Sequence, residues 1–288
     1  MEQETHSSSC VIRFRVSPGE REMPQRPTKK VTVKKLPRHK GIVLGIDIGG
    51  TGIKGAPVDT RTGKLLAERH RIETPKGASV KDITAAVKAI ADHFSWKGRI
   101  GCTIPGVVQR GVVRTAANIS KEWIGTNGVS ALKRATKCSC ALLNDADAAG
   151  LAEAKFGAGK NNTGLVAVVT LGTGIGTALV NNGSLIPNSE LGHLILNGKD
   201  AEEIASNRVR EENDLEWDEW AKGVESYLQY FESLIWPDLY IIGGGVSKKS
   251  EKFLPKIKTR AKLTPAKLKN DAGIIGAALY ALSIKAVK

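Results

Sequence analysis

The chain has 288 residues, of which 41% are hydrophobic, and a formal net charge of +14. At ~150 residues per domain this length predicts two lobes. The apolar runs are too short for a membrane-spanning helix of ~20 residues, so we expect no membrane partner. The basic excess favours a polyanionic partner, such as nucleic acid, an acidic surface or a chain of phosphates.

Residues 1–38 contain clusters of Ser, Pro and basic residues with little periodicity, which predicts a disordered basic extension. The segment lacks the apolar core of a secretory signal, and acidic residues weaken an organelle transit peptide: Glu2, Glu4, Glu20 and Glu22. It has no helix-turn-helix pattern, so we expect no nucleic-acid partner. We therefore expect a cytoplasmic protein, with organelle targeting as the alternative.

From Gly41 the pattern predicts three strands in a meander, at 42–48, 53–58 and 65–72. An amphipathic helix follows at 79–94, because apolar residues recur there at helical spacing, and a further strand is expected at 99–104. The unit reads β-β-β-α-β.

The second half of the chain repeats the start of the first. After Leu142 we expect an Ala-rich helix to about Phe156, and then strands at 164–171 and 175–180 across a Gly-rich turn. Helices are predicted at 201–211 and 215–234, a strand at 239–242, a helix after Ser247 and a closing helix near 271–284. We therefore expect an α/β fold with an N-terminal lobe at 39–142, completed by a closing helix at 271–288, and a C-terminal lobe at 143–270.

Three Gly-rich clusters indicate phosphate binding, since backbone N–H groups without side chains nearby approach a phosphate closely. They are Asp47-Ile48-Gly49-Gly50-Thr51-Gly52, Leu171-Gly172-Thr173-Gly174-Ile175-Gly176 and Gly243-Gly244-Gly245. Any one alone is explained as well by a tight turn, but two of them occupy matching places in a repeat. None has the P-loop pattern or the dinucleotide-binding pattern.

These clusters belong to a set of motifs that resembles the ROK sugar kinases over residues 41–285. The set is Gly45-Ile46-Asp47-Ile48-Gly49-Gly50-Thr51, Asn144-Asp145-Ala146, Gly172-Thr173-Gly174-Ile175-Gly176, Glu190-Leu191-Gly192-His193 and Gly243-Gly244-Gly245. Within that family, the runs from Gly52 to Asp59 and from Pro187 to His193 resemble polyphosphate glucokinases. The resemblance implies an actin-like ATPase (ribonuclease-H-like) fold, in which two lobes enclose the active-site cleft.

The implied reaction is phosphoryl transfer from inorganic polyphosphate to the 6-hydroxyl of glucose, which gives glucose 6-phosphate. The implied partners are therefore glucose and polyphosphate, with Mg²⁺ as cofactor and a homodimer as the assembly. An ATP-dependent hexose kinase of the same family and a non-catalytic sugar sensor remain as alternatives.

Transfer to a sugar hydroxyl needs a carboxylate that accepts its proton. Asp145 follows an apolar strand at the expected start of a helix, where backbone donors should keep it ionised at neutral pH. An ordinary helix N-cap explains it equally well. The resemblance favours the catalytic interpretation, since in the family the Asp of the Asn-Asp pair is the base. Asp147 is the near competitor, and helical geometry should direct it away from Asp145.

The resemblance implies the remaining site residues. The sugar-binding set is Gly106, Asn118, Asn144, Asp145, Glu190, His193 and Glu202. For Glu202 a solvated helix face is an equal explanation. The phosphate-binding set is Asp47, Gly49, Gly50, Thr51, Gly52, Lys54, Gly172, Thr173, Gly174, Gly243, Gly244 and Gly245, with Asp47 also holding Mg²⁺ through water.

Two further observations concern ligands. The wider family binds zinc through a Cys-rich run after the histidine that matches His193, and no Cys follows Cys140 here, so we expect no structural zinc. Basic residues follow the third Gly cluster and predict a track for polyphosphate, although a solvated basic face is a serious rival. They are Lys248, Lys249, Lys252, Lys256, Lys258, Arg260, Lys262, Lys267 and Lys269.

Overall fold

The computed structural model describes residues 41–284. The extension expected at residues 1–38 and the last residues of the expected closing helix, 285–288, lie outside the described residues. Within 41–284, no helix is both long and apolar enough to cross a bilayer.

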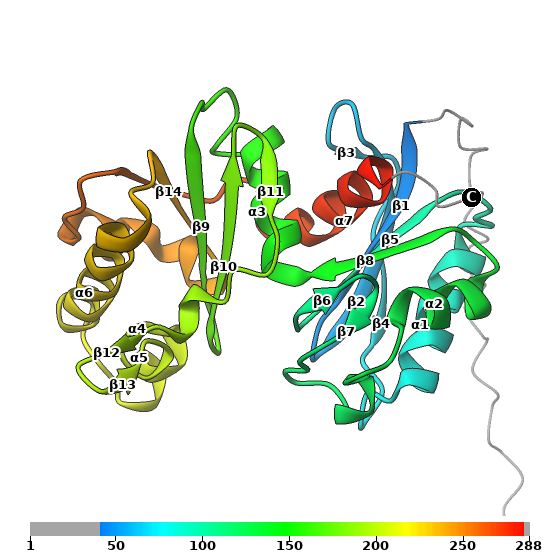
Figure 1. Ribbon diagram of the computed structural model, residues 1–288, viewed down its shortest axis with the longest axis horizontal. Coiled ribbons are helices and arrows are strands. Elements are labelled where there is room, and N and C mark those ends of the chain that lie inside the picture. Colours follow the sequence, from blue (N-terminus) through cyan, green and yellow to red (C-terminus); the bar gives the residue numbers. More distant parts are fainter. Residues whose placement is uncertain (1–40, 285–288) are drawn as a thin grey trace, which may run out of the picture. The chain divides into compact units, whose positions relative to one another are not determined.

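The first sheet is built from residues 42–144 (Figure 1). Its strands are β1 (Ile42–Ile48), β2 (Gly52–Asp59), β3 (Lys64–Leu65), β4 (His70–Glu73), β5 (Ile100–Ile104) and β8 (Cys140–Asn144). Their order is β3-β2-β1-β5-β8, and β4 pairs with β2. The β1–β2 pair is antiparallel, whereas β5 pairs in parallel with both β1 and β8.

Helices cover both faces of the first sheet, which explains why its central strands are apolar on both sides. Leu44 and Ile46 face a core with α1 (Val80–His93), whose N-cap Ser79 accepts a hydrogen bond from Asp82 N. The helix α2 (Gly128–Thr136) contributes Leu132 to the same core. Val43 points to the other face, where it packs with residues of α7 (Ala272–Ser283).

The second sheet repeats this topology with residues 165–265. Its strands are β9 (Leu165–Leu171), β10 (Ile175–Asn181), β11 (Ser184–Ile186), β14 (Leu239–Gly243) and β15 (Lys262–Pro265), in the order β11-β10-β9-β14-β15. Its pairing pattern is also the same. The pairs β9–β10 and β10–β11 are antiparallel, whereas β14 pairs in parallel with both β9 and β15. The helix α6 (Trp217–Ile235) packs on one face, and α3 (Asp145–Phe156) contacts β9 and β10. The repeat confirms the expected α/β class.

Two helices connect the sheets, because α7 packs on β1 and β5, α3 packs on the second sheet, and the helices contact each other (Figure 1). The close packing of α7 against β5 and against α3 depends on glycine. A Cβ at Gly101 would lie 1.9 Å from Ala277 O, and one at Gly276 would lie 1.8 Å from Ala148 O. Closely packed backbones at this junction place the start of α3 next to the end of β1. The division into lobes at 142/143 and 270/271 stays a prediction.

The remaining elements are short. They are β6 (Val108–Gln109), β7 (Val112–Val113), β12 (Ile195–Leu196), β13 (Lys199–Asp200), α4 (Glu202–Ala205) and α5 (Asn207–Glu212), together with the 3₁₀ helices η1 (Lys121–Trp123), η2 (Leu191–His193), η3 (Gly245–Lys252), η4 (Leu254–Lys256) and η5 (Lys269–Asp271).

Three predicted elements were wrong in detail. The single strand at 65–72 is two strands, because the register against β2 shifts by two residues between the pairs Val58–Leu65 and Ile53–Ile72. The helix at 201–211 breaks at Ser206, which is extended and caps α5 by accepting from Val209 N. The helix after Ser247 is η3, which begins earlier, at Gly245. Neither α2 nor β15 was predicted.

Candidate active site

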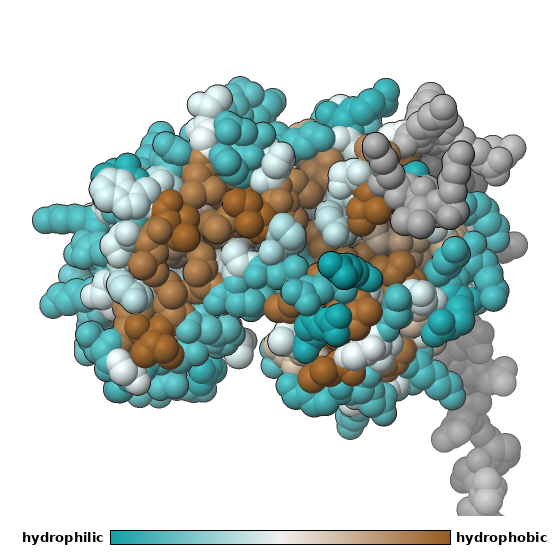
Figure 2. Space-filling model, viewed as in Figure 1, coloured by the Kyte–Doolittle hydropathy of each residue, from teal (hydrophilic) through white to brown (hydrophobic). Residues whose placement is uncertain are grey.

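The predicted sugar-binding residues gather in one cavity of about 800 Å³. It is lined by all seven of them: Gly106, Asn118, Asn144, Asp145, Glu190, His193 and Glu202. On the face in Figure 2 the molecule is notched between the part that carries α4 and α5 and the part that carries β6 and β7. Residues from both parts line the cavity, so the chain brings together positions nearly one hundred residues apart, from Gly106 to Glu202.

A second cavity of about 250 Å³ contains part of the predicted phosphate-binding set. Asp47, Lys54 and the Gly243-Gly244-Gly245 cluster line it. Gly244 has φ +83°, and a Cβ there would lie 2.2 Å from Leu171 O, so the turn from β14 into η3 requires glycine.

The other two Gly-rich clusters lie elsewhere. Gly172, Thr173 and Gly174 line the larger cavity. The turn from Gly49 to Gly52 is described by the structure and lines neither cavity. It lies beside Asn118, whose Cβ is 3.1 Å from the position of a Cβ on Gly50.

Asp145 lies where the two cavities meet. Among residues 41–284, only four line both of them: Asp145, Ala146, Thr170 and Gly244. Asp145 is the first residue of α3, and the N-cap is its neighbour Asn144, whose side chain accepts from Asp147 N at 3.0 Å. The N-cap explanation of Asp145 is therefore wrong, because Asn144 already fills that role.

The environment of Asp145 disfavours its charged form. The side chain is open to the cavities but enclosed by their walls, and this desolvation, with smaller contributions from the charges of Asp47 and Glu190, raises the pKa of Asp145 to about 7. The expected backbone donor is present, since Ala146 N donates to Asp145 Oδ1 at 2.9 Å. Backbone hydrogen bonds lower this pKa less than burial raises it, so the expectation that backbone donors keep Asp145 ionised at neutral pH was wrong.

Asp147 does not compete for the role of base. Its side chain is 1% exposed and lines neither cavity. Its Oδ2 accepts from Asn188 N at 2.8 Å. The predicted difference in direction between the two aspartates is confirmed by these contacts.

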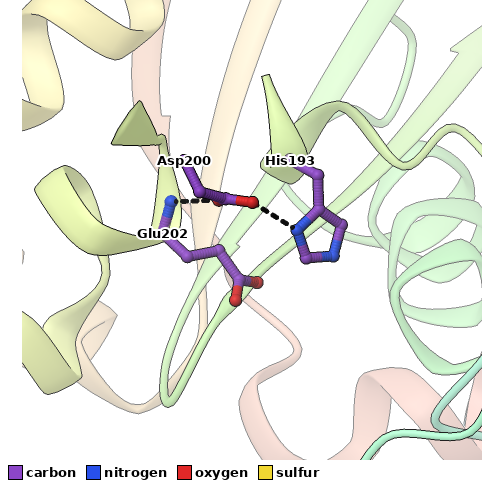
Figure 3. A group of neighbouring side chains, drawn as sticks. All are labelled: His193, Asp200 and Glu202. Atoms are coloured by element: carbon purple, nitrogen blue, oxygen red, sulfur yellow. Dashed lines mark hydrogen bonds and ion pairs between the residues drawn. The ribbon is translucent and has the colours of Figure 1, made fainter. Parts of the chain in front are cut away.

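Two residues that line the larger cavity, His193 and Glu202, are both in contact with Asp200 (Figure 3). His193 Nδ1 lies 3.0 Å from Asp200 Oδ2, and Asp200 Oδ1 accepts from Glu202 N at 2.9 Å. The hydrogen bond that His193 donates to Asp200 raises the pKa of His193. Because Nδ1 is occupied, the Nε2 atom is the one left for a ligand.

One possible ligand atom from each of His193, Asp200 and Glu202 lies within 4.8 Å of the other two, a spacing at which three residues can share a metal ion. They fit a metal poorly, because Asp200 uses both oxygens in the contacts above and Glu202 Oε1 accepts from Ile175 N at 2.7 Å. Gly174 makes room for Glu202, since a Cβ there would lie 2.3 Å from Glu202 Oε1. The expected lack of a structural zinc stays a prediction.

Asp47 is the predicted magnesium-binding residue. Its Oδ1 accepts from Thr103 Oγ1 at 2.7 Å, and its Oδ2 lies 3.1 Å from Lys54 Nζ. A single carboxylate beside a phosphate-sized cavity fits the way proteins hold Mg²⁺, which keeps several waters and binds substrate phosphates. The negative charge of Asp47 also raises the pKa of Asp145, and a cation between them would relieve this repulsion.

Four of the nine basic residues after the third Gly cluster show whether their charge is available to a donor. Lys248 and Lys269 line the smaller cavity. Lys256 is paired with Asp218 at 2.7 Å, and Arg260 lies 4.0 Å from Glu232. Acidic residues of α6 therefore neutralise Lys256 and Arg260, and only part of the predicted track has its charge available beside the cavity.

Sequence reasoning missed several residues of the site. Arg114, Lys121 and Thr177 line the larger cavity, and Asp200 holds His193. Asp200 belongs to no motif that we used. Its spacing, seven residues after His193 and two before Glu202, becomes informative only when the β12–β13 hairpin returns the chain to His193.

Comparisons with known proteins place these residues in context. The profile of the ROK family matches residues 43–213. The polyphosphate glucokinase of Mycobacterium tuberculosis strain H37Rv is 49% identical over 241 residues, which cover 83% of this chain and 91% of the relative. The polyphosphate glucokinase of Mycobacterium leprae is 45% identical over 245 residues, covering 84% of this chain and 74% of the relative.

A solved structure is similar as well. The inorganic polyphosphate/ATP-glucomannokinase from Arthrobacter sp. strain KM superposes with a TM-score of 0.79 at 45% sequence identity, and the match covers 84% of this chain and 98% of that one. This likeness and the two equivalent sheets confirm the expected actin-like ATPase fold.

Proposed function

Because the chain belongs to the ROK family, we propose that it transfers a phosphoryl group from inorganic polyphosphate to the 6-hydroxyl of glucose, giving glucose 6-phosphate. The observation that carries the proposal is the position of Asp145, which lines both the cavity with the sugar-binding set and the cavity with part of the phosphate-binding set. A base at such a junction can contact the acceptor hydroxyl next to the donor phosphate.

In the proposed reaction, glucose occupies the larger cavity with its 6-hydroxyl toward Asp145. The ionised carboxylate accepts the hydroxyl proton while the oxygen attacks the terminal phosphorus of the donor in line, and the shortened polyphosphate leaves. A pKa of about 7 suits this role, because the base is available near neutral pH and still accepts a proton readily.

The other sugar-binding residues orient the acceptor. Asn144 is fixed at the start of α3 and donates to Gly106 O at 3.3 Å, so its position is set by both the strand and the helix. Glu190 and His193 hold hydroxyls at the far end of the ring, and Glu202 contributes beside them. Precise orientation of this kind supplies much of the rate enhancement in phosphoryl transfer.

The donor phosphates bind in the smaller cavity, beside Lys54, Lys248 and the Gly243-Gly244-Gly245 cluster. Mg²⁺ is the cofactor that we propose here, held with Asp47, and it would neutralise the phosphate oxygens. The Gly172-Thr173-Gly174 cluster lines the larger cavity. The Gly49-Gly50-Thr51-Gly52 turn keeps its predicted phosphate role as part of the proposal.

Two features favour polyphosphate over ATP as donor. Of the described residues that line the smaller cavity, none is aromatic, and its apolar members are small: Ala146, Ala149, Val168, Ala266 and Ala272. Such walls offer no large flat surface for an adenine ring, whereas Lys248 and Lys269 suit further phosphates. ATP remains the second candidate, since the similar Arthrobacter enzyme is named for both donors. A sugar sensor is disfavoured by the presence of Asp145.

We also propose a homodimer in the cytoplasm that takes no nucleic acid as partner, and these points rest on the family resemblance and on the sequence.

The test is formation of glucose 6-phosphate by the purified full chain with Mg²⁺ and either polyphosphate or ATP at equal terminal phosphate. Polyphosphate should give the higher kcat/KM. A clear preference for ATP would keep the kinase and reject the donor assignment. Lack of turnover with both donors, in a chain that binds glucose, would favour the sensor.

A further inference from the structure

Asp147 is a buried carboxyl group that the proposed reaction does not use. Its side chain is 1% exposed, and its Oδ1 has no hydrogen-bond partner among residues 41–284. Its Oδ2 accepts from the backbone N–H of Asn188 at 2.8 Å. Burying a carboxyl group costs free energy. The one hydrogen bond that the Asp147 side chain makes, with Asn188 N, is therefore the place to look for its role.

Asn188 continues the connection from Asp147 to β6. Its side-chain amide pairs with both backbone polar groups of Val108 in β6: Val108 N donates to Asn188 Oδ1 at 3.0 Å, and Asn188 Nδ2 donates to Val108 O at 3.1 Å. Asn188 has φ +61°, a conformation that Asn tolerates better than most residues. The contact joins segments eighty residues apart in the chain.

The segments that are joined carry opposite walls of the larger cavity. Val108 lies two residues after Gly106, which lines one wall, and Asn188 lies two residues before Glu190, which lines the other. Thr177 holds the other end of the Glu190 segment, because its hydroxyl donates to Ser189 O and accepts from Leu191 N at 3.0 Å. Glu190 is therefore flanked on both sides by anchored backbone.

We propose that Asp147 and Asn188 are positioning residues that hold Glu190 against β6 and so set the width of the sugar-binding cavity. Neither residue lines the cavity. Their effect on the sugar passes through Glu190 and through the backbone near Gly106. The inference rests on the proposed function, in that glucose is taken as the ligand of the larger cavity.

The first variant is Asn188→Gly. Glycine accepts the positive φ without strain, so the change removes the two side-chain hydrogen bonds to Val108 and little else. The loss of two neutral hydrogen bonds should weaken glucose binding roughly tenfold. The kcat at saturating glucose and the KM for polyphosphate should stay within about twofold, since neither residue contacts the donor cavity.

The matched control is Asn161→Gly. Asn161 also has positive φ, +66°, and is exposed, and no side-chain hydrogen bond of Asn161 is found within the described part of the chain. This control should bind glucose like the unaltered protein, which separates loss of the Val108 contacts from a general effect of glycine.

A second pair of variants tests Asp147. Asp147→Asn keeps an oxygen that accepts from Asn188 N, and burial already raises the pKa of Asp147 to about 7, so a neutral side chain is tolerated there. Asp147→Ala removes the acceptor. We expect Asp147→Asn to bind glucose within about twofold of the unaltered protein and Asp147→Ala to bind it roughly tenfold more weakly.

Glucose affinity is measured by titration calorimetry without donor, so the result does not depend on turnover, and thermal unfolding checks that each variant is folded. Unchanged affinity in Asn188→Gly, or equal weakening in Asp147→Asn and Asp147→Ala, would overturn the positioning role alone. If the unaltered protein does not bind glucose, the proposed function fails and this inference fails with it. Should Asn188→Gly not fold, the Asp147 pair decides the question.

Discussion

At the scale of single residues, the site depends on how neighbouring aspartates of one helix are separated. Asp145 opens toward the two cavities, and Asp147 is buried against Asn188. Both carry a pKa raised to about 7, chiefly by desolvation. The pKa values therefore do not distinguish the two aspartates. The position of Asp145 beside the cavities is what assigns it as the base.

Replacing the base tests that assignment. Asp145→Asn keeps the shape and polarity of the side chain but removes proton acceptance, so kcat should fall roughly 10²- to 10⁴-fold. Glucose affinity in a donor-free titration should change little. A variant that retains a substantial share of the kcat would show that another group accepts the proton.

The pH dependence of the reaction follows from the same residue. Because the pKa of Asp145 is raised to about 7, the carboxyl is protonated at lower pH and cannot act as base, so kcat/KM should decline by about tenfold per pH unit below ~7. The measurement is kcat/KM for glucose from pH 5 to 8.5. The apparent pKa belongs to the interacting group of Asp145, Asp147 and Glu190.

Asp147→Asn is the control for this profile. It removes the neighbouring titration and leaves the base, so the acidic decline should persist, with its midpoint moved slightly down because a nearby negative charge is lost. A rate independent of pH between 5 and 8 would contradict the role of Asp145.

At the scale of elements, the turn from β14 into η3 brings the donor cavity and the basic residues together. Gly243, Gly244 and Gly245 line the cavity, and Lys248 is the fourth residue of η3. The same segment also carries basic residues that are already paired, because α6 lies alongside with Asp218 and Glu232. A lysine count along the sequence therefore overstates the charge available to a donor.

Lys248 and Lys256 form a matched pair of test positions. Lys248→Gln should raise the KM for polyphosphate roughly three- to tenfold, because it removes a charge that lines the donor cavity. Lys256→Gln should leave this KM nearly unchanged, since Lys256 is paired with Asp218 at 2.7 Å. Equal effects of both substitutions on the KM would favour a diffuse basic face over a defined site.

At the scale of the whole molecule, the formal charge of +14 and the polyanionic donor make salt a diagnostic variable. Release of counterions should make log KM for polyphosphate rise with log salt concentration. The KM for glucose, which is neutral, should stay nearly constant over the same range. A flat dependence for polyphosphate would argue against an extended basic contact.

The sequence by itself determined the α/β class and the repeated meander, and its short motifs carry the resemblance that supplied the sugar-binding set. Those features depend on local patterns: buried apolar runs such as Ile42–Ile48, and short motifs such as Asn144-Asp145 that act through their own turn and helix start. The family resemblance added the reaction, which neither composition nor spacing indicates.

The tertiary structure decided the rest. Sheet register decided the break between β3 and β4. Sheet order and helix packing decided which distant segments meet: Lys256 with Asp218, Asp200 with His193, and Asp147 through Asn188 with Val108. The raised pKa of Asp145 also depends on the tertiary structure. Desolvation and the charge of Asp47 outweigh the local backbone hydrogen bonds, and both arise only when folding brings the cavity walls together.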